Sequence, residues 1–103
     1  MRLPSAQLQA IVEAAQQFFG STCQVVLFGS RVRDESRGGD IDLLIETPLD
    51  MEQAVRARWL FLARLARLFG ERSIDVVLTQ DASRDPRRVV AEALREGVPL
   101  CPR

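Results

Sequence analysis

Three short apolar segments rich in β-branched residues constrain the fold of this chain more than any other feature. Polar or glycine-containing stretches bound each of them, as is typical of strands in a core. They are interspersed with stretches whose apolar residues recur at helical spacing. The predicted elements in chain order are a helix at 5–19, strands at 23–28 and 41–45, a helix at 50–70, a strand at 74–78 and a helix at 85–97. This order predicts an α/β (α+β) fold, a small sheet with helices packed against it.

The predicted helix ends carry recognisable signals. Asp50 with Gln53 three residues later resembles a capping box at the start of the second helix. Asp85 followed by Pro86 predicts that the last helix begins there, and Gly97 predicts its end. Apolar side chains lie on more than one side of the segment 51–69. Burial of this helix on two sides and an apolar strip that binds a partner protein both explain that pattern.

The length predicts one domain over 1–103, because a chain of this size can bury a single core. The longest uninterrupted apolar run, from Trp59 to Ala63, is too short to span a membrane. Cys23 and Cys101 are far apart in the sequence and match no metal-binding motif, so we expect free thiols. These features together predict a cytoplasmic protein without a membrane partner.

The charge composition excludes several chemistries. The 14 basic residues are all arginine, they balance 14 acidic residues, and the chain has no histidine. A Ser–His–Asp triad, a histidine zinc site and a lysine Schiff base are therefore impossible within this chain. Because there is no basic excess and there are few aromatic residues, we do not expect direct binding of nucleic acid.

Three aspartates form the strongest candidate for a chemical site. Asp40 and Asp42 flank Ile41 at the start of a predicted strand, so their side chains share one face. Asp75 occupies a similar place in the third predicted strand. If these strands pair, the three carboxylates converge and repel one another unless cations lie between them. Mg²⁺ is the natural complement, and two such ions can assist a phosphoryl displacement.

Gly29 and Ser30 follow the first predicted strand and suit a phosphate. Glycine permits close approach of the backbone, and a serine hydroxyl and N–H can donate to phosphate oxygens. Alone, a Gly-Ser pair is usually a turn and an Asp-x-Asp is usually a solvated strand edge. Their combination with Asp75 favours a triphosphate site beside a metal-binding carboxylate cluster.

At these residues the chain resembles the minimal nucleotidyltransferases, small members of the DNA polymerase β-like superfamily. The resemblance rests on VVLFGSRVRDESRGGDIDLLIE at 25–46 and SIDVVL at 73–78. The spacer at 31–39 is shorter than the family's usual spacer, and Asp34 stands where glycine is common. The resemblance implies a palm fold with a small mixed sheet. It also implies transfer of a nucleoside monophosphate, usually AMP from ATP, to an acceptor hydroxyl.

The resemblance also implies roles for individual residues. Asp40 and Asp42 would ligate the metal ions, and Asp75 would ligate the catalytic metal and help to take the acceptor proton. The residues expected to contact the phosphates are Gly29 and Ser30, with Arg31 or Arg33 as electrostatic helpers.

Chains this small resemble the antitoxin half of a toxin–antitoxin pair, whose partner is a helical HEPN-domain ribonuclease. The resemblance implies that the antitoxin binds this toxin, attaches AMP to one of its tyrosines, or does both. An apolar strip on 51–69 would suit a helical partner. Two alternatives are a binding-only antitoxin that blocks its partner by contact and a small-molecule (antibiotic) nucleotidyltransferase.

Overall fold

A computed structural model describes residues 5–29, 41–70 and 73–100 of the chain. The predicted positions Ser30, Arg31, Arg33 and Asp40 lie outside the described residues. The elements in chain order are α1 (Ser5–Phe19), β1 (Gln24–Phe28), β2 (Ile41–Glu46), α2 (Met51–Phe69), β3 (Ile74–Thr79), the short 3₁₀ helix η2 (Ala82–Arg84), α3 (Arg88–Glu96) and β4 (Val98–Pro99).

The four strands in the described part of the chain form one mixed sheet in the order β3-β2-β1-β4. β1 pairs with β2 and β4 in antiparallel fashion, whereas β2 and β3 are parallel. The parallel pair is possible because α2 connects the end of β2 to the start of β3 across one face of the sheet. The predicted α/β class and mixed sheet are thus confirmed.

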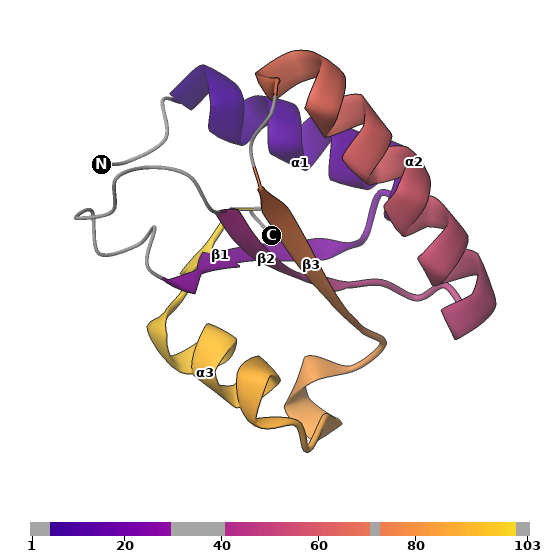
Figure 1. Ribbon diagram of the computed structural model, residues 1–103. Helices are drawn as coiled ribbons and strands as arrows, with labels where there is room; N and C mark the ends of the chain where they lie inside the picture. Colours follow the sequence, from indigo (N-terminus) through magenta and orange to yellow (C-terminus); the bar gives the residue numbers. More distant parts are fainter. Residues whose placement is uncertain (1–4, 30–40, 71–72, 101–103) are drawn as a thin grey trace.

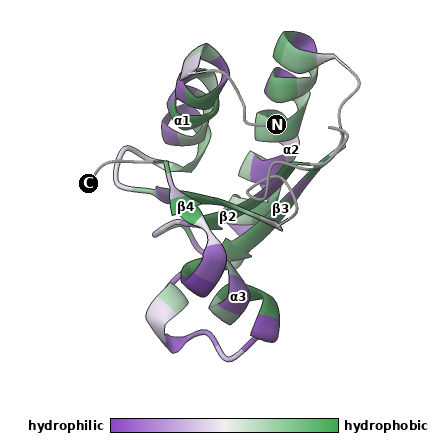
Figure 2. Ribbon diagram, turned by 90° about the vertical axis from the view of Figure 1, so that its left-hand side faces the viewer, coloured by the Kyte–Doolittle hydropathy of each residue, from purple (hydrophilic) through white to green (hydrophobic). Residues whose placement is uncertain are grey.

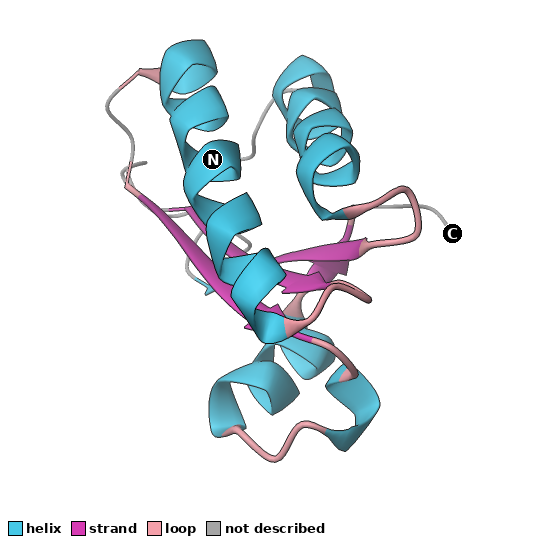
Figure 3. Cartoon of the chain, turned by 90° about the vertical axis from the view of Figure 1, so that its right-hand side faces the viewer, coloured by secondary structure: helices cyan, strands magenta, loops and turns pink. Residues whose placement is uncertain are grey.

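Helices cover both faces of the sheet. Figures 1 and 3 show α1 and α2 side by side on one face and α3 on the other. Alternation along β2 matches this arrangement. Ile41, Leu43 and Ile45 are buried in the larger core under α1 and α2, whereas Leu44 belongs to the smaller core under α3. The side chains of Asp42 and Glu46 therefore share the α3 face with Leu44.

Two predicted helix ends are confirmed in α2. The Asp50 side chain accepts a hydrogen bond from the backbone N–H of Gln53 at 2.8 Å, which satisfies one of the unpaired donors of the first turn. At the other end Gly70 has a φ of 77°, and its N–H donates to the carbonyl of Ala66. Glycine adopts this conformation without the steric cost that a Cβ would bring.

The predicted start of the last helix is wrong. Asp85 does not cap α3, which begins at Arg88 with Arg87 in the N-cap position. The reason is that the Asp85 carboxylate accepts hydrogen bonds from the backbone and side chain of Arg87 and from the hydroxyl of Thr79. These bonds hold Asp85 in the connection that precedes the helix. The predicted end at Gly97 is confirmed, because its N–H donates to the carbonyl of Ala93.

α2 is buried along one side, so burial of this helix on two sides is not what the structure shows. Its core-facing residues are Ala54, Ala57, Phe61 and Leu65. The ring of Phe61 meets that of Phe19 edge to face, with 5.4 Å between the ring centroids. Trp59, by contrast, is 66% exposed, and Leu60 and Leu68 are also exposed.

Hydropathy follows these layers. In Figure 2 the strands are mostly hydrophobic, whereas the ribbon of α3 is a mixture of hydrophilic and hydrophobic residues. No helix in the described ranges combines the length and the apolar character that crossing a bilayer requires.

Candidate active site

Two of the predicted carboxylates meet on neighbouring strands. In the parallel pairing of β2 with β3, Asp42 and Asp75 are direct Cα partners. Partners in a sheet present their side chains on the same face, so both carboxylates lie on the α3 face at the start of the parallel pair. Asp42 is half-buried and Asp75 is exposed. Asp40, the third predicted carboxylate, lies outside the described residues.

The end of β1 completes this arrangement. Phe28 is the Cα partner of Asp42 in the antiparallel pair, and Gly29 follows it with a φ of 86°. A Cβ built on Gly29 would overlap Oδ2 of Asp42. Glycine is therefore needed here for two reasons, namely the left-handed backbone and the space that the carboxylate occupies. The close approach that the structure shows at Gly29 is to Asp42. The predicted approach of a phosphate to Gly29 and Ser30 stays a prediction, and Ser30 lies outside the described residues.

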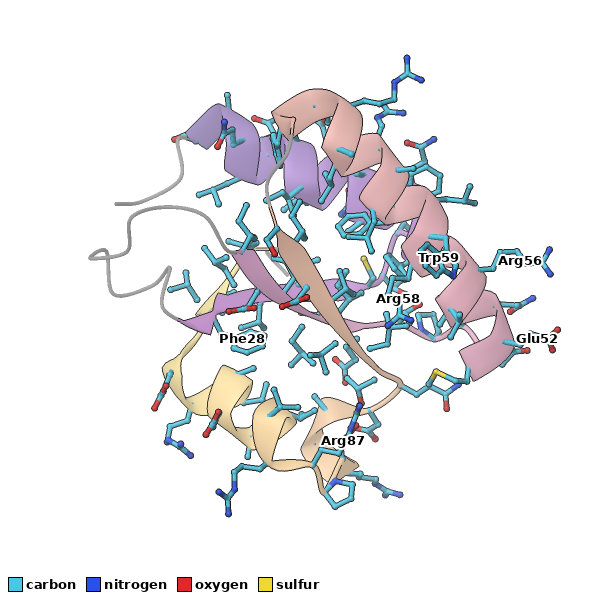
Figure 4. The ribbon with its side chains drawn as sticks, in the orientation of Figure 1. Phe28, Glu52, Arg56, Arg58, Trp59 and Arg87 are labelled. Atoms are coloured by element: carbon cyan, nitrogen blue, oxygen red, sulfur yellow. The ribbon has the colours of Figure 1, made fainter. Side chains whose placement is uncertain are left out.

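A cavity of about 560 Å³ lies beside the two carboxylates. Its lining comes from β1, β2, β3, α2 and α3, and consists of Phe28, Asp42, Arg58, Trp59, Leu62, Ile74, Asp75, Val76, Val77 and Val89. In Figure 4, Arg58 and Trp59 come from α2 and Phe28 from β1, with β3 drawn between them. The cavity thus combines acidic, cationic and aromatic groups at one edge of the sheet.

A second cavity of about 550 Å³ lies at the start of α2 and includes Asp50, Glu52 and Arg56. The Asp50 carboxylate there accepts the capping hydrogen bond from Gln53. None of the predicted site residues lines this second cavity, so it is the weaker candidate for chemistry.

The arrangement fits a hard divalent cation. Asp42 and Asp75 offer only oxygen donors, and Mg²⁺ is commonly held by one or two carboxylates together with substrate phosphates. Because Gly29 has no side chain, its backbone lies directly against the Asp42 carboxylate. Within the described ranges, no group of three or more acidic, cysteine or histidine residues is placed to hold a metal ion. A complete set would have to draw on Asp40 or on the substrate.

An ionic cluster at the other end of β3 was missed by the sequence reasoning. The Asp85 carboxylate accepts four hydrogen bonds, three from Arg87 and one from the buried Thr79 hydroxyl. Bonding to Arg87 is the largest cause that holds the pKa of Asp85 well below its usual range, and the same bond raises the pKa of Arg87. Asp85 and Arg87 are two positions apart in the sequence, with one residue between them, and this proximity was the available signal.

The chain was also compared with known proteins. A family model described as nucleotidyltransferase domain matches residues 8–98. No curated protein matches the chain. The matched region runs from within α1 to the start of β4 and contains both described carboxylates. The chain therefore belongs to the nucleotidyltransferase domain family, a family of transferases within the polymerase β-like superfamily.

Proposed function

We propose that this protein is a Mg²⁺-dependent nucleotidyltransferase that moves AMP from ATP to a hydroxyl group of a protein. The single observation that carries the proposal is the register of Asp42 opposite Asp75, with Gly29 packed against the Asp42 carboxylate. Two carboxylates placed side by side on neighbouring strands repel each other and cations relieve that repulsion, so their juxtaposition favours a role with cations.

Each residue of the site has a role in this reaction. The acceptor oxygen attacks the α-phosphorus, the bond from that phosphorus to the β-phosphate oxygen breaks, and pyrophosphate leaves. Asp75 takes the hydroxyl proton, for which its exposed carboxylate is accessible. Asp42 orients the nucleotide from the middle of the sheet. The backbone at Gly29 would meet the phosphates, and Ser30 with Arg31 or Arg33, which lie outside the described residues, would contact them too.

Asp40, Asp42 and Asp75 are the residues that would hold Mg²⁺. The chemistry that Mg²⁺ supplies in such sites is neutralisation of charge on the phosphates and on the attacking oxygen. Two ions would suit the three carboxylates.

We further propose that the acceptor is a tyrosine of a helical HEPN-type toxin and that the protein acts as its antitoxin. The exposed apolar side chains of α2 support a protein partner, because four of the large exposed apolar residues found in the described part of the chain lie on this helix: Met51, Trp59, Leu60 and Leu68. Exposed tryptophan and methionine side chains are enriched at protein interfaces.

The experiment uses labelled ATP, Mg²⁺ and the purified product of the neighbouring gene. We expect wild type to transfer label to that protein, and Asp42→Ala or Asp75→Ala to transfer at least about 100-fold less. Glu52→Ala, an exposed acidic residue away from the site, is the matched control and should transfer as wild type. Absence of transfer by wild type, or full transfer by the aspartate variants, would contradict the proposal.

A second candidate function is neutralisation of the toxin by contact alone, and the exposed apolar residues of α2 favour it too. In that case Asp75→Ala still protects cells, whereas Leu60→Arg or Leu68→Arg does not. If transfer is required, Asp75→Ala loses protection although it still binds the toxin.

A further inference from the structure

The outer edge of β3 is the feature of the site that the proposed function does not use. β3 stands at the end of the sheet order, so β2 covers only one of its two edges. An edge strand presents a row of backbone N–H and C=O groups that can pair with another chain.

The hydrogen bonds to β2 identify which groups face outward. The carbonyls of Ser73 and Thr79 accept from the amides of Ile41 and Thr47, at 2.9 and 3.0 Å. The N–H and C=O of one strand residue point to the same side, and the direction alternates along the strand. The odd-numbered residues of β3 therefore face β2. The backbone groups of Ile74, Val76 and Leu78 face outward.

Arg87 closes this edge at one end. Its Nη2 donates to the carbonyl of Leu78 at 2.6 Å, which confirms that the carbonyl faces outward. The guanidinium is itself held by the Asp85 carboxylate at 2.8 Å. Figure 4 shows Arg87 at the α3 end of β3. Among the described residues no hydrogen bond occupies the outward groups of Ile74 and Val76, so in this part of the chain the edge next to Asp75 is unpaired.

The cavity beside the carboxylates runs along this open part of the edge. It is lined by the four consecutive residues 74–77. Because successive side chains of a strand point to opposite faces, a cavity that touches four in a row must pass around the strand's edge. On its α2 side it is bordered by Leu62 and the exposed ring of Trp59.

The geometry of transfer selects the occupant of this edge. In an in-line displacement the attacking and leaving oxygens lie on opposite sides of the phosphorus. Gly29, at the phosphate end, follows β1, and β2 with Asp42 separates β1 from β3. With pyrophosphate leaving toward Gly29, the acceptor hydroxyl must approach from the β3 side, past Asp75.

We propose that the open edge of β3 binds an extended segment of the acceptor protein as an added strand, with one of its apolar side chains against Trp59 and its hydroxyl at Asp75. The placement of the hydroxyl rests on the proposed adenylyl transfer, whereas the strand pairing rests on the edge alone. Arg87 would stop the added strand at Leu78 and so limit its register. In the transfer step the hydroxyl oxygen bonds to the α-phosphorus, pyrophosphate departs and the proton passes to Asp75.

The first test reads binding without ATP. The probe is a set of overlapping peptides that cover the neighbouring gene product, and the signal is the fluorescence of Trp59, the single tryptophan of a chain that has no tyrosine. For the peptide that binds, two versions are made with N-methyl groups on alternate amides. In an added strand every second amide faces β3 and the others face away. We expect methyl groups on the amides that face β3 to weaken binding about tenfold or more, and methyl groups on the other amides to leave binding unchanged.

The second test reads transfer. Ile74→Pro removes an outward N–H at the first residue of an edge strand, where proline is tolerated, and Ile74→Val is its matched control. We expect the proline variant to transfer AMP to the partner about tenfold less than wild type, the valine variant to transfer normally, and both to bind ATP with Mg²⁺ equally in calorimetry.

The outcomes separate the two proposals. Equal binding of the two methylated peptides, binding of no peptide at all, or full transfer by Ile74→Pro would overturn the added strand and leave adenylyl transfer standing. Weaker binding of only one of the two methylated peptides, together with no AMP transfer by wild type, would support the added strand and refute the proposed reaction.

Discussion

The two ends of β3 hold acidic side chains in opposite situations. At one end the Asp85 carboxylate accepts four hydrogen bonds, three of them from Arg87. At the other end Asp75 lies exposed opposite Asp42, and in the described part of the chain its side chain has no hydrogen bond or ion pair. A carboxylate that is fully engaged stabilises the fold but has no oxygen left for a ligand. The difference assigns stability to one end of β3 and chemistry to the other.

Neutralising each acid in turn tests this division most strongly. Asp75→Asn should lower AMP transfer about 10²–10⁴-fold while changing the free energy of unfolding by less than about 0.5 kcal/mol. Asp85→Asn should lower the free energy of unfolding, because an amide cannot replace the charge opposite Arg87, and its folded fraction should transfer normally. Urea unfolding and the labelled-ATP assay measure both effects. Equal effects of the two variants on both quantities would contradict the division.

The next largest expected effect is the loss of folding stability when Gly29, which borders Asp42, is replaced. Gly29→Ala places a Cβ on the Asp42 carboxylate in addition to straining a residue with φ of 86°. Gly70→Ala is the matched control, because its φ is 77° and no atom of the described residues lies within 4 Å of its Cβ position. Both should lose about 1–2 kcal/mol through strain, and Gly29→Ala should lose about 1–3 kcal/mol more through overlap. Equal losses in urea unfolding would show that Asp42 moves aside freely.

Acid should weaken the Asp85 end selectively. Hydrogen bonds from Arg87 hold the folded-state pKa of Asp85 well below its unfolded value, so the stabilisation is present above about pH 4. It is lost as pH falls from there toward the folded-state pKa, because the unfolded chain then binds the proton more readily. We expect the stability difference between wild type and Asp85→Asn to shrink between about pH 6 and about pH 2. A difference that stays constant over this range would contradict the role of the ion pair.

The smallest effect is expected at Thr79. Thr79→Val keeps the shape of a buried side chain but removes the hydroxyl that donates to Asp85 at 2.8 Å. Because Arg87 still supplies three donors, the loss should be about 0.5–1.5 kcal/mol, with no change in transfer. Thermal or urea unfolding measures the loss. An effect as large as that of Asp85→Asn would mean that the hydroxyl, rather than the guanidinium, holds the cluster together.

The sequence predicted the regular elements of this fold well because their signals are local. The helix at 5–19 has the predicted bounds, and the three main strands differ from their predicted ends by a residue at most. The pairing of strands and their directions depend on contacts between distant segments, which spacing alone does not encode. β4 was not predicted for the same reason, since two residues gain strand character only by pairing with Val26 and Leu27.

The candidate site, too, was predictable where its signal is local and not where it depends on contacts between distant segments. Alternation in β2 correctly predicted that Ile41, Leu43 and Ile45 face the core, and so that Asp42 faces away from it. The sequence could not show that Asp75 lies directly opposite Asp42, because that depends on the register of a parallel pair. The sequence also did not show which side of α2 packs on the core. Trp59 and Phe61 are both large aromatic residues, but only Phe61 is buried.

The strand at the other border of the sheet, β4, limits how copies of this protein could join through their sheets. β4 is only two residues long and contains Pro99, which lacks an N–H, so this strand is a poor template for a further chain. The two borders of the sheet are thus unequal in the described part of the chain. Copies that joined through β3 would form a closed pair whose outer strands are both β4, and growth into a fibre would stop there.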